Sequence, residues 1–250
     1  SITQKYVIIW NQLKYLEMKS FDCNLQEEII AVQPDLLFEE KQTISDLTMI
    51  KKKKIIKKAF NFLRLEKNIF SIGEHECGQT IFVRNCYLQL WEEIQKNQKQ
   101  KKKFVITGTP GIGKSSFIFW ILWKLRQSHS DAPVYVHSQH FGESLMLEFF
   151  NNSVNLIEIN NFTTIIHQNA YYLVDPSNIR PLKCDGITII CVSPNHLSER
   201  LLKDAVKDNC TKYYMPVWER AEIVACGKLC YPNMSDREIL EGFSTCGGIP

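Results

Sequence analysis

A glycine-rich loop between an apolar strand and an apolar helix constrains this chain more than any other stretch. Residues 103–116 read KFVITGTPGIGKSS, in which Gly108, Gly113, Lys114 and Ser115 fit the Walker A pattern G-x-x-x-x-G-K-[ST]. In such a loop the backbone N–H groups curl around phosphate oxygens, and glycine allows the close approach and the tight turn that this requires. The helix after the loop adds unpaired N–H groups and the positive end of its dipole. The loop therefore predicts a phosphate-binding site.

The side chains of the loop have expected roles in binding a nucleoside triphosphate. Lys114 would reach the β- and γ-phosphates, and the Ser115 hydroxyl would take one Mg²⁺ position. The alternative is a chance glycine loop, but the strand before it and the helix after it both favour the phosphate site. The expected nucleotide-contacting residues are Gly108, Thr109, Pro110, Gly111, Ile112, Gly113, Lys114, Ser115 and Ser116.

Strands and helices are expected to alternate through residues 81–250, which we interpret as a P-loop NTPase domain. Apolar runs predict strands at 103–107, 133–138, 170–175, 186–193 and 212–215. The expected helices are 84–98, 117–125, 145–150, 157–168, 196–208, 218–230 and 235–243. This alternation predicts an α/β fold of three layers, with a parallel sheet covered by helices on both faces.

Polar residues follow two of the expected strands. Ligands of open α/β sheets bind outside the carboxyl ends of the strands. Asp175 occupies the Walker B position, where a carboxylate holds Mg²⁺. Ser193 and Asn195 occupy the place where additional-strand ATPases keep a polar residue near the γ-phosphate. The alternatives are an aspartate that caps a turn before Pro176 and an ordinary Ser-Pro-Asn turn. The sequence thus proposes Lys114, Asp175 and Ser193 as catalytic residues, and Ser115 and Asp175 as Mg²⁺ ligands.

The residue after Asp175 bears on whether ATP is hydrolysed. Many ATPases place there the glutamate that activates the attacking water, and this chain has Pro176. Hydrolysis would need another base, would be slow, or would not occur. Glu158 and Asp185 are acidic residues without an assigned role. An arginine to stabilise transition-state charge would come from Arg180, Arg200, Arg220 or a position beyond Pro250.

The positive charge is concentrated before the strand that leads into the glycine loop. Residues 1–103 hold 18 of the chain's 30 Lys and Arg but 13 of its 27 Asp and Glu. We expect a basic amphipathic helix over 50–65, which includes the run Lys51–Lys54. A solvated helix face is one interpretation of these lysines, and nuclear import or nucleic-acid contact is the other. Residues 1–20 fit a helix or a strand equally well. We therefore expect residues 1–80 to form a smaller, mostly helical or mixed segment before the NTPase domain.

Some classes of protein are disfavoured by what the sequence lacks. No apolar run reaches membrane-spanning length, so no membrane partner is expected. The start shows neither an initiator methionine nor a signal peptide. Because the chain begins at Ser1 and ends at Pro250 directly after Gly247-Gly248-Ile249, we expect it to be part of a longer protein, truncated at the C-terminus.

Several segments together resemble one family. They are Val83–Tyr87 (VRNCY), the loop Ile106–Ser115, Tyr172–Asp175 (YLVD), Ser193–Asn195 (SPN), Tyr214–Trp218 (YMPVW) and Gly247–Pro250 (GGIP). Over residues 80–250 the chain resembles the P-loop ATPase domain of Crinkler-type effectors and retrotransposon-hot-spot proteins. The loop alone indicates a P-loop NTPase, and the SPN and MPVW segments narrow the resemblance.

The resemblance implies a STAND- or AAA-like ATPase module, often followed by a nuclease-like or kinase-like toxin domain. Crinklers are typically secreted by oomycetes or fungi and act in the host nucleus. By position, Lys114, Ser115 and Asp175 would be the nucleotide and Mg²⁺ residues, and ATP would be the nucleotide. The first eighty residues differ from the ubiquitin-like header common in Crinklers, and family members continue beyond Gly-Gly-Ile-Pro.

Three functions remain open from the sequence. The first is an ATP-binding module that acts as a nucleotide-dependent switch or slow ATPase in a host-directed effector. The second is an active ATP hydrolase or phosphotransferase, and the third is a nucleic-acid-binding ATPase, favoured by the basic front half. The expected partner is a nucleotide. A nucleic acid, a host nuclear protein and further copies of the chain are the other candidate partners.

Overall fold

The computed structural model describes residues 2–32, 49–65, 80–128, 131–142, 144–159, 169–175, 181–194 and 210–246. Its centre is a seven-stranded sheet in the order β10-β4-β9-β8-β5-β6-β7. Five strands run parallel to their neighbours, and β6 and β7 extend the sheet as an antiparallel hairpin. The bounds are β4 Lys103–Thr107, β5 Val134–Ser138, β6 Leu145–Phe150, β7 Ser153–Glu158, β8 Tyr171–Asp175, β9 Ile187–Val192 and β10 Thr211–Tyr214. Strand β9 therefore lies between the strand before the glycine loop and the strand that ends in Asp175.

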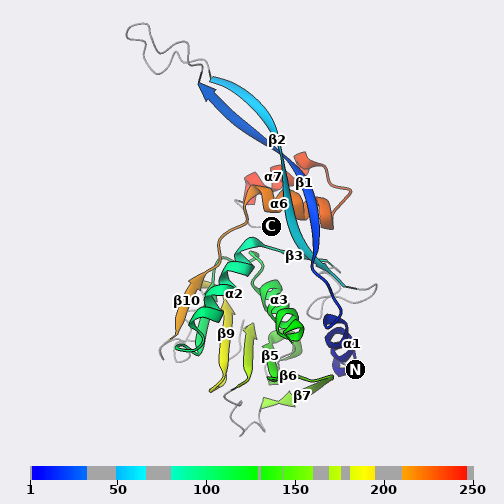
Figure 1. The fold of residues 1–250 in the computed structure, drawn as a ribbon, viewed down its shortest axis with the longest axis vertical. Helices are drawn as coiled ribbons and strands as arrows, with labels where there is room; N and C mark the ends of the chain where they lie inside the picture. Colours follow the sequence, from blue (N-terminus) through cyan, green and yellow to red (C-terminus); the bar gives the residue numbers. More distant parts are fainter. Residues whose placement is uncertain are drawn as a thin grey trace.

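Both faces of β4, β5, β8 and β9 are buried, which explains their continuous apolar sequences, whereas the edge strand β10 is partly exposed. Helices α2 (Asn85–Asn97) and α3 (Lys114–Gln127) lie together on one face (Figure 1). Phe104, Ile106 and Leu173 belong to the large core cluster on that face. Their neighbours in sequence, including Val105 and Tyr172, point the other way into a second buried cluster.

Residues 145–158 differ from the sequence-based expectation. A helix was expected over 145–150 and another from 157, but β6 and β7 form a hairpin in which Leu145 pairs with Glu158. A six-residue apolar run has no period that separates a buried strand from a short helix. Pairing of β6 with the edge of β5 decides between them. The rest of the expected helix, 160–168, and the helix expected over 196–208 lie outside the described residues.

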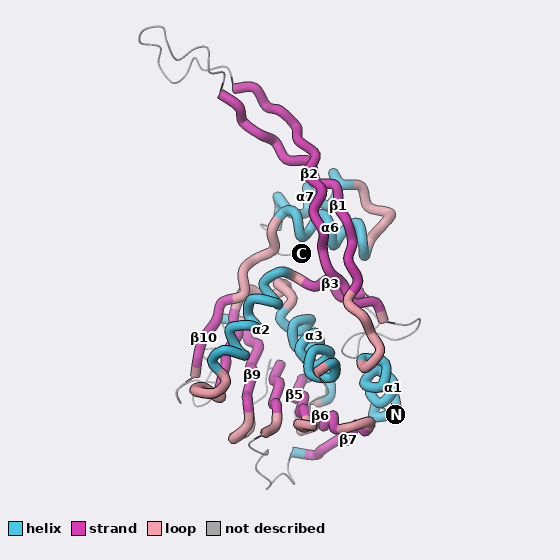
Figure 2. The backbone as a smooth tube through the Cα atoms, viewed as in Figure 1, coloured by secondary structure: helices cyan, strands magenta, loops and turns pink. Residues whose placement is uncertain are grey.

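The first sixty-five residues combine a helix with a long hairpin. Helix α1 (Ile2–Leu13) packs on α3 and β7, with Ile9, Trp10 and Leu13 buried. Strands β1 (Lys19–Val32) and β2 (Met49–Arg64) form an antiparallel ribbon, and β3 (Thr80–Val83) pairs with the end of β2. Figure 2 shows the far half of this ribbon projecting beyond the rest of the fold.

The basic helix expected over 50–65 is wrong, because this segment forms strand β2. From residue 55 to residue 62 exposure alternates with a period of two: Phe60 and Phe62 are buried, whereas Lys57 and Ala59 are exposed. The apolar positions at 55, 56, 59, 60 and 63 also fit a helical stripe. Pairing with β1, which lies about thirty residues earlier in the chain, selects the strand.

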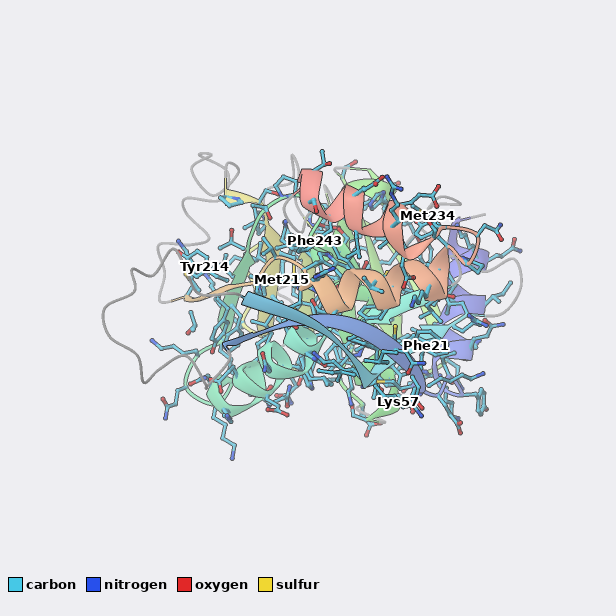
Figure 3. All side chains as sticks on the ribbon, turned by 90° about the horizontal axis from the view of Figure 1, so that it is seen from above. Phe21, Lys57, Tyr214, Met215, Met234 and Phe243 are labelled. Carbon is cyan, nitrogen blue, oxygen red and sulfur yellow. The ribbon has the colours of Figure 1, made fainter. Side chains whose placement is uncertain are left out.

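Two further helices complete the described chain. Helices α6 (Arg220–Cys230) and α7 (Asp236–Cys246) pack on each other, and α6 contacts β1. In Figure 3, Phe21 and Lys57 mark the ribbon, Met215 marks the segment leading from β10, and Met234 and Phe243 mark the helical pair. None of the helices in the described ranges is long and apolar enough to span a membrane. The domain boundary near residue 80 stays a prediction. Strand β3 begins at this point and pairs with β2 of the preceding segment.

Candidate functional site

The glycine loop spans the gap between the end of β4 and the first turn of α3. Gly113 has a left-handed backbone conformation, with φ of 94°, which L-residues other than glycine rarely adopt. The Tyr87 hydroxyl donates a hydrogen bond to the Gly113 carbonyl at 2.7 Å. A Cβ atom on Gly113 would collide with that hydroxyl. Glycine is therefore required at this position by both conformation and space.

The base of the loop is fixed from the neighbouring strand. The Met215 N–H, directly after β10, donates to the Thr107 carbonyl at 2.8 Å. A Cβ atom on Gly108 would lie 2.8 Å from the Met215 carbonyl oxygen, which is too close for any larger residue. Ile112, in the second half of the loop, is fully buried and packs in the large core cluster.

Lys114 begins α3 and lies across the loop. Its side chain is largely buried, with 9% of the residue exposed. Nζ donates to the Gly108 carbonyl at 2.8 Å and to the Thr109 carbonyl at 2.7 Å. Burial lowers the pKa of Lys114, while the nearby Asp175 acts in the opposite direction. The ammonium group thus lies inside the loop, where an anion would compensate its lost hydration.

Asp175 ends β8 beside the start of α3. The Ser115 hydroxyl lies beside its carboxylate and favours the ionised form. Burial raises the pKa of Asp175, and the Ser115 hydroxyl, His140 and Lys114 partly offset this effect. The structure thus brings Lys114, Ser115 and Asp175 together. A hydroxyl and a carboxylate side by side are oxygen ligands of the kind Mg²⁺ takes in nucleotide sites.

The other expected site residues have less distinctive surroundings. Ser193 is partly exposed directly after β9. Val174 pairs with Ile190, and Ser193 lies three residues beyond Ile190. Ser193 is therefore at the carboxyl ends of the strands, as Asp175 is. Pro110, Gly111 and Ser116 are exposed, whereas Thr109 is partly buried. The Thr109 hydroxyl oxygen is buried without a hydrogen-bond partner in the described parts of the chain.

The acidic residues considered as substitutes for the missing glutamate are not close to Asp175. Asp185 precedes β9 and therefore lies at the amino ends of the parallel strands, whereas Asp175 lies at a carboxyl end. Glu158 ends β7, three strands away from β8, which at about 4.8 Å per strand is roughly 14 Å. Arg220 is exposed at the first position of α6. Arg180, Arg200, Asn195 and Pro176 lie outside the described residues.

Three residues at this site were not assigned a role from sequence. They are Tyr87, already described, and the buried pair Arg84 and Glu222, whose atoms Nη2 and Oε2 are 2.9 Å apart. Arg84 also donates to the Ile112 carbonyl of the loop at 2.9 Å. Arg84 and Tyr87 belong to the VRNCY segment on which the family resemblance partly rests, and that segment was the available signal.

Comparisons with known proteins find distant similarity to Crinkler effectors. Crinkler effector protein 15 of Phytophthora infestans is 24% identical over 190 residues, covering 69% of this chain and 28% of the relative. Crinkler effector protein 16 of the same organism matches with the same identity and coverage. The chain therefore spans just over a quarter of the length of these curated relatives. No protein-family profile matches the chain. The similarity supports a distant relation to Crinkler effectors.

Proposed function

We propose that this chain is an ATP-binding P-loop module that acts as a nucleotide-dependent switch, with slow turnover or none. One observation carries the proposal: Lys114, Ser115 and Asp175 meet at the mouth of a loop whose carbonyl groups are held by other parts of the fold. The strand order supports it, because β9 separates β4 from β8 as expected for an additional-strand NTPase.

The residues present fit a Mg²⁺–nucleotide complex. The Lys114 ammonium would exchange its two carbonyl acceptors for phosphate oxygens, and the loop N–H groups would surround the same phosphates. Ser115 and Asp175 would hold Mg²⁺, which when bound neutralises phosphate charge. The unpartnered Thr109 hydroxyl is a further polar atom that a phosphate or its hydration water would satisfy.

Slow turnover follows from the groups around Asp175. Neither Glu158 nor Asp185 is within reach of a water beside Asp175, and a proline follows that aspartate. Binding that exceeds turnover suits a switch, in which a nucleotide shifts a conformational equilibrium by its different affinity for two states. An active hydrolase is the second candidate function.

The host-directed part of the proposal comes from the relation to the Crinkler effectors of Phytophthora infestans. We propose that the module works within a secreted effector that acts in the host nucleus or cytoplasm. The lysines of β2 would serve nuclear entry. Fusion of the chain to a fluorescent protein in plant cells tests this directly: nuclear accumulation lost on replacing Lys51–Lys54 with alanine supports it, and accumulation unchanged by that replacement contradicts it.

The experiment that tests nucleotide binding is titration of ATP and GTP, each with Mg²⁺, into the purified chain and its Lys114→Ala variant. Phosphate release is followed in parallel. Saturable ATP binding that weakens in the variant, with release far slower than about one per second, is the expected result. Release at that rate or faster, abolished in the variant, would instead establish the hydrolase.

Lys124→Ala is the matched control, because Lys124 lies in the same helix but packs over the rings of Trp120 and Trp123. ATP affinity should be unchanged in this variant. A wild-type chain that is folded by circular dichroism and binds neither nucleotide would refute the proposal.

A further inference from the structure

Arg84 is a buried arginine whose five N–H groups are all used. Nε and one Nη2 hydrogen bond go to Glu222 Oε2 at 3.1 and 2.9 Å. Nη1 donates to the carbonyls of Ile112 and Pro216, both at 2.9 Å, and Nη2 donates to the Val217 carbonyl at 2.8 Å. The guanidinium plane also lies 4.6 Å from the ring centre of Trp218. One side chain thus joins the glycine loop to the segment that leads into α6.

The contact with Ile112 fixes the direction of a loop N–H group. In a planar trans peptide the C=O and the following N–H point in opposite directions. Holding the Ile112 carbonyl toward Arg84 therefore turns the Gly113 N–H away from it. The Tyr87 hydroxyl does the same for the next peptide, because it holds the Gly113 carbonyl and so turns the Lys114 N–H. These are two consecutive donors of the expected phosphate cradle.

The other end of the Arg84 network belongs to α6. Glu222 Oε2 also accepts from the backbone N–H of Glu219, which forms a capping box with it at the start of the helix. Glu222 is 3% exposed and Arg84 is 1% exposed, so each charge depends on the other for compensation. Movement of the loop carbonyl and movement of the α6 start therefore disturb the same set of hydrogen bonds.

We infer that Arg84 and Tyr87 are positioning residues that orient the loop N–H groups toward phosphate, and that Arg84–Glu222 couples nucleotide binding to the position of α6 and α7. This inference rests on the proposed nucleotide binding and names how that binding is transmitted. Coupling of this kind is reciprocal: whatever displaces α6 changes nucleotide affinity by the same factor as nucleotide changes the α6 equilibrium.

The test measures the ATP–Mg²⁺ dissociation constant by calorimetry for wild type, Tyr87→Phe, Arg84→Lys and Glu222→Gln. Tyr87→Phe removes one hydrogen bond and should weaken binding about fivefold. Arg84→Lys and Glu222→Gln should weaken it roughly 5- to 150-fold, although Glu222 does not touch the loop. Matched controls are Tyr135→Phe and the exposed ion-pair partners Arg237→Lys and Glu241→Gln, which should leave affinity within twofold.

A second readout separates positioning from general destabilisation. Hydrogen exchange of α6 amides is measured with and without ATP–Mg²⁺ in wild type and in Glu222→Gln. Nucleotide should slow exchange in α6 of wild type and leave it unchanged in Glu222→Gln. Thermal midpoints without nucleotide identify any variant that fails to fold, in which case Tyr87→Phe and the wild-type exchange data decide.

The outcomes distinguish this inference from the proposed function. Wild type that binds ATP, with Tyr87→Phe and Glu222→Gln binding equally well and α6 exchange insensitive to nucleotide, overturns the inference and leaves the function standing. Wild type that binds no nucleotide overturns both.

Discussion

The Ser115 hydroxyl in the first turn of α3 lies beside the Asp175 carboxylate at the end of β8. The two residues are sixty positions apart in sequence and meet because α3 packs over β8 and β9. The contact pairs a hydroxyl with a carboxylate that has lost much of its hydration. Asp175 is therefore held where its ionised form is disfavoured until a cation arrives.

Replacing Asp175 by asparagine should raise the stability of the chain without nucleotide. Burial raises the pKa of Asp175, so the ionised carboxylate costs folding free energy at neutral pH. An amide has the same shape beside Ser115 and carries no charge. The thermal midpoint should rise by about 2–4 °C for each kcal/mol recovered, while the stabilisation by ATP–Mg²⁺ is lost. A midpoint that falls by several degrees would contradict this interpretation.

The same shift predicts a pH dependence with a definite sign. Because the folded chain holds the Asp175 proton more tightly than the unfolded chain, this group favours folding below its ordinary pKa of 3.8. That contribution is lost as pH rises through the raised folded value. The difference in unfolding free energy between wild type and Asp175→Asn should therefore shift against wild type as pH increases over this window. Denaturant melts at several pH values measure it, and a difference that is flat with pH would rule it out.

Gly113→Ala should damage the loop through conformation and space together. A left-handed φ costs an alanine about 1–2 kcal/mol, and the new methyl group meets the Tyr87 hydroxyl. We expect loss of unfolding free energy of about 1–3 kcal/mol and loss of ATP binding. Gly242→Ala is the control: it lies in α7 with no atom of the described chain within 4 Å of the added Cβ. Its stability should stay equal or rise by up to about 1 kcal/mol.

Sequence reasoning was most successful where a pattern has a local cause. The loop between β4 and α3, the helix over 85–97 and strand β9 agree with expectation because glycine spacing and apolar period are local properties. The contact between Ser115 and Asp175 was implied by the two motifs, each of which has a fixed place on a strand or helix.

The failures have a non-local cause. Strand β2 was mistaken for a helix because its apolar residues fit both periods, and only the register with β1 selects the strand. The β6–β7 hairpin depends likewise on the free edge of β5. Arg84 and Glu222 could not be paired from sequence, since 138 positions separate them and neither belongs to a spacing motif.

The basic ribbon offers a test of the nucleic-acid alternative. Six lysines lie between residues 51 and 58 of β2, and both Lys57 and Lys58 have an acidic partner. Glu27 and Glu28 are opposite Lys54 and Lys53 in the register, Lys57 is 2.8 Å from Asp22, and Lys58 is 3.6 Å from Glu219. In the same register Ile30 is opposite Lys51 and Ile29 is opposite Lys52.

The salt dependence of DNA binding reports how many lysines contact phosphates, because each such contact releases counterions. The logarithm of DNA affinity falls with the logarithm of salt concentration by about 0.9 for each phosphate neutralised. Two lysines on phosphates would give a slope near −2, whereas six would give about −5. We expect weak binding with the shallower slope, measured by fluorescence anisotropy with a duplex of about 20 base pairs between 50 and 200 mM salt. A slope near −5 that becomes shallower on replacing Lys51–Lys54 with alanine would favour the nucleic-acid-binding ATPase, because the ribbon would then contact the backbone despite its acidic neighbours.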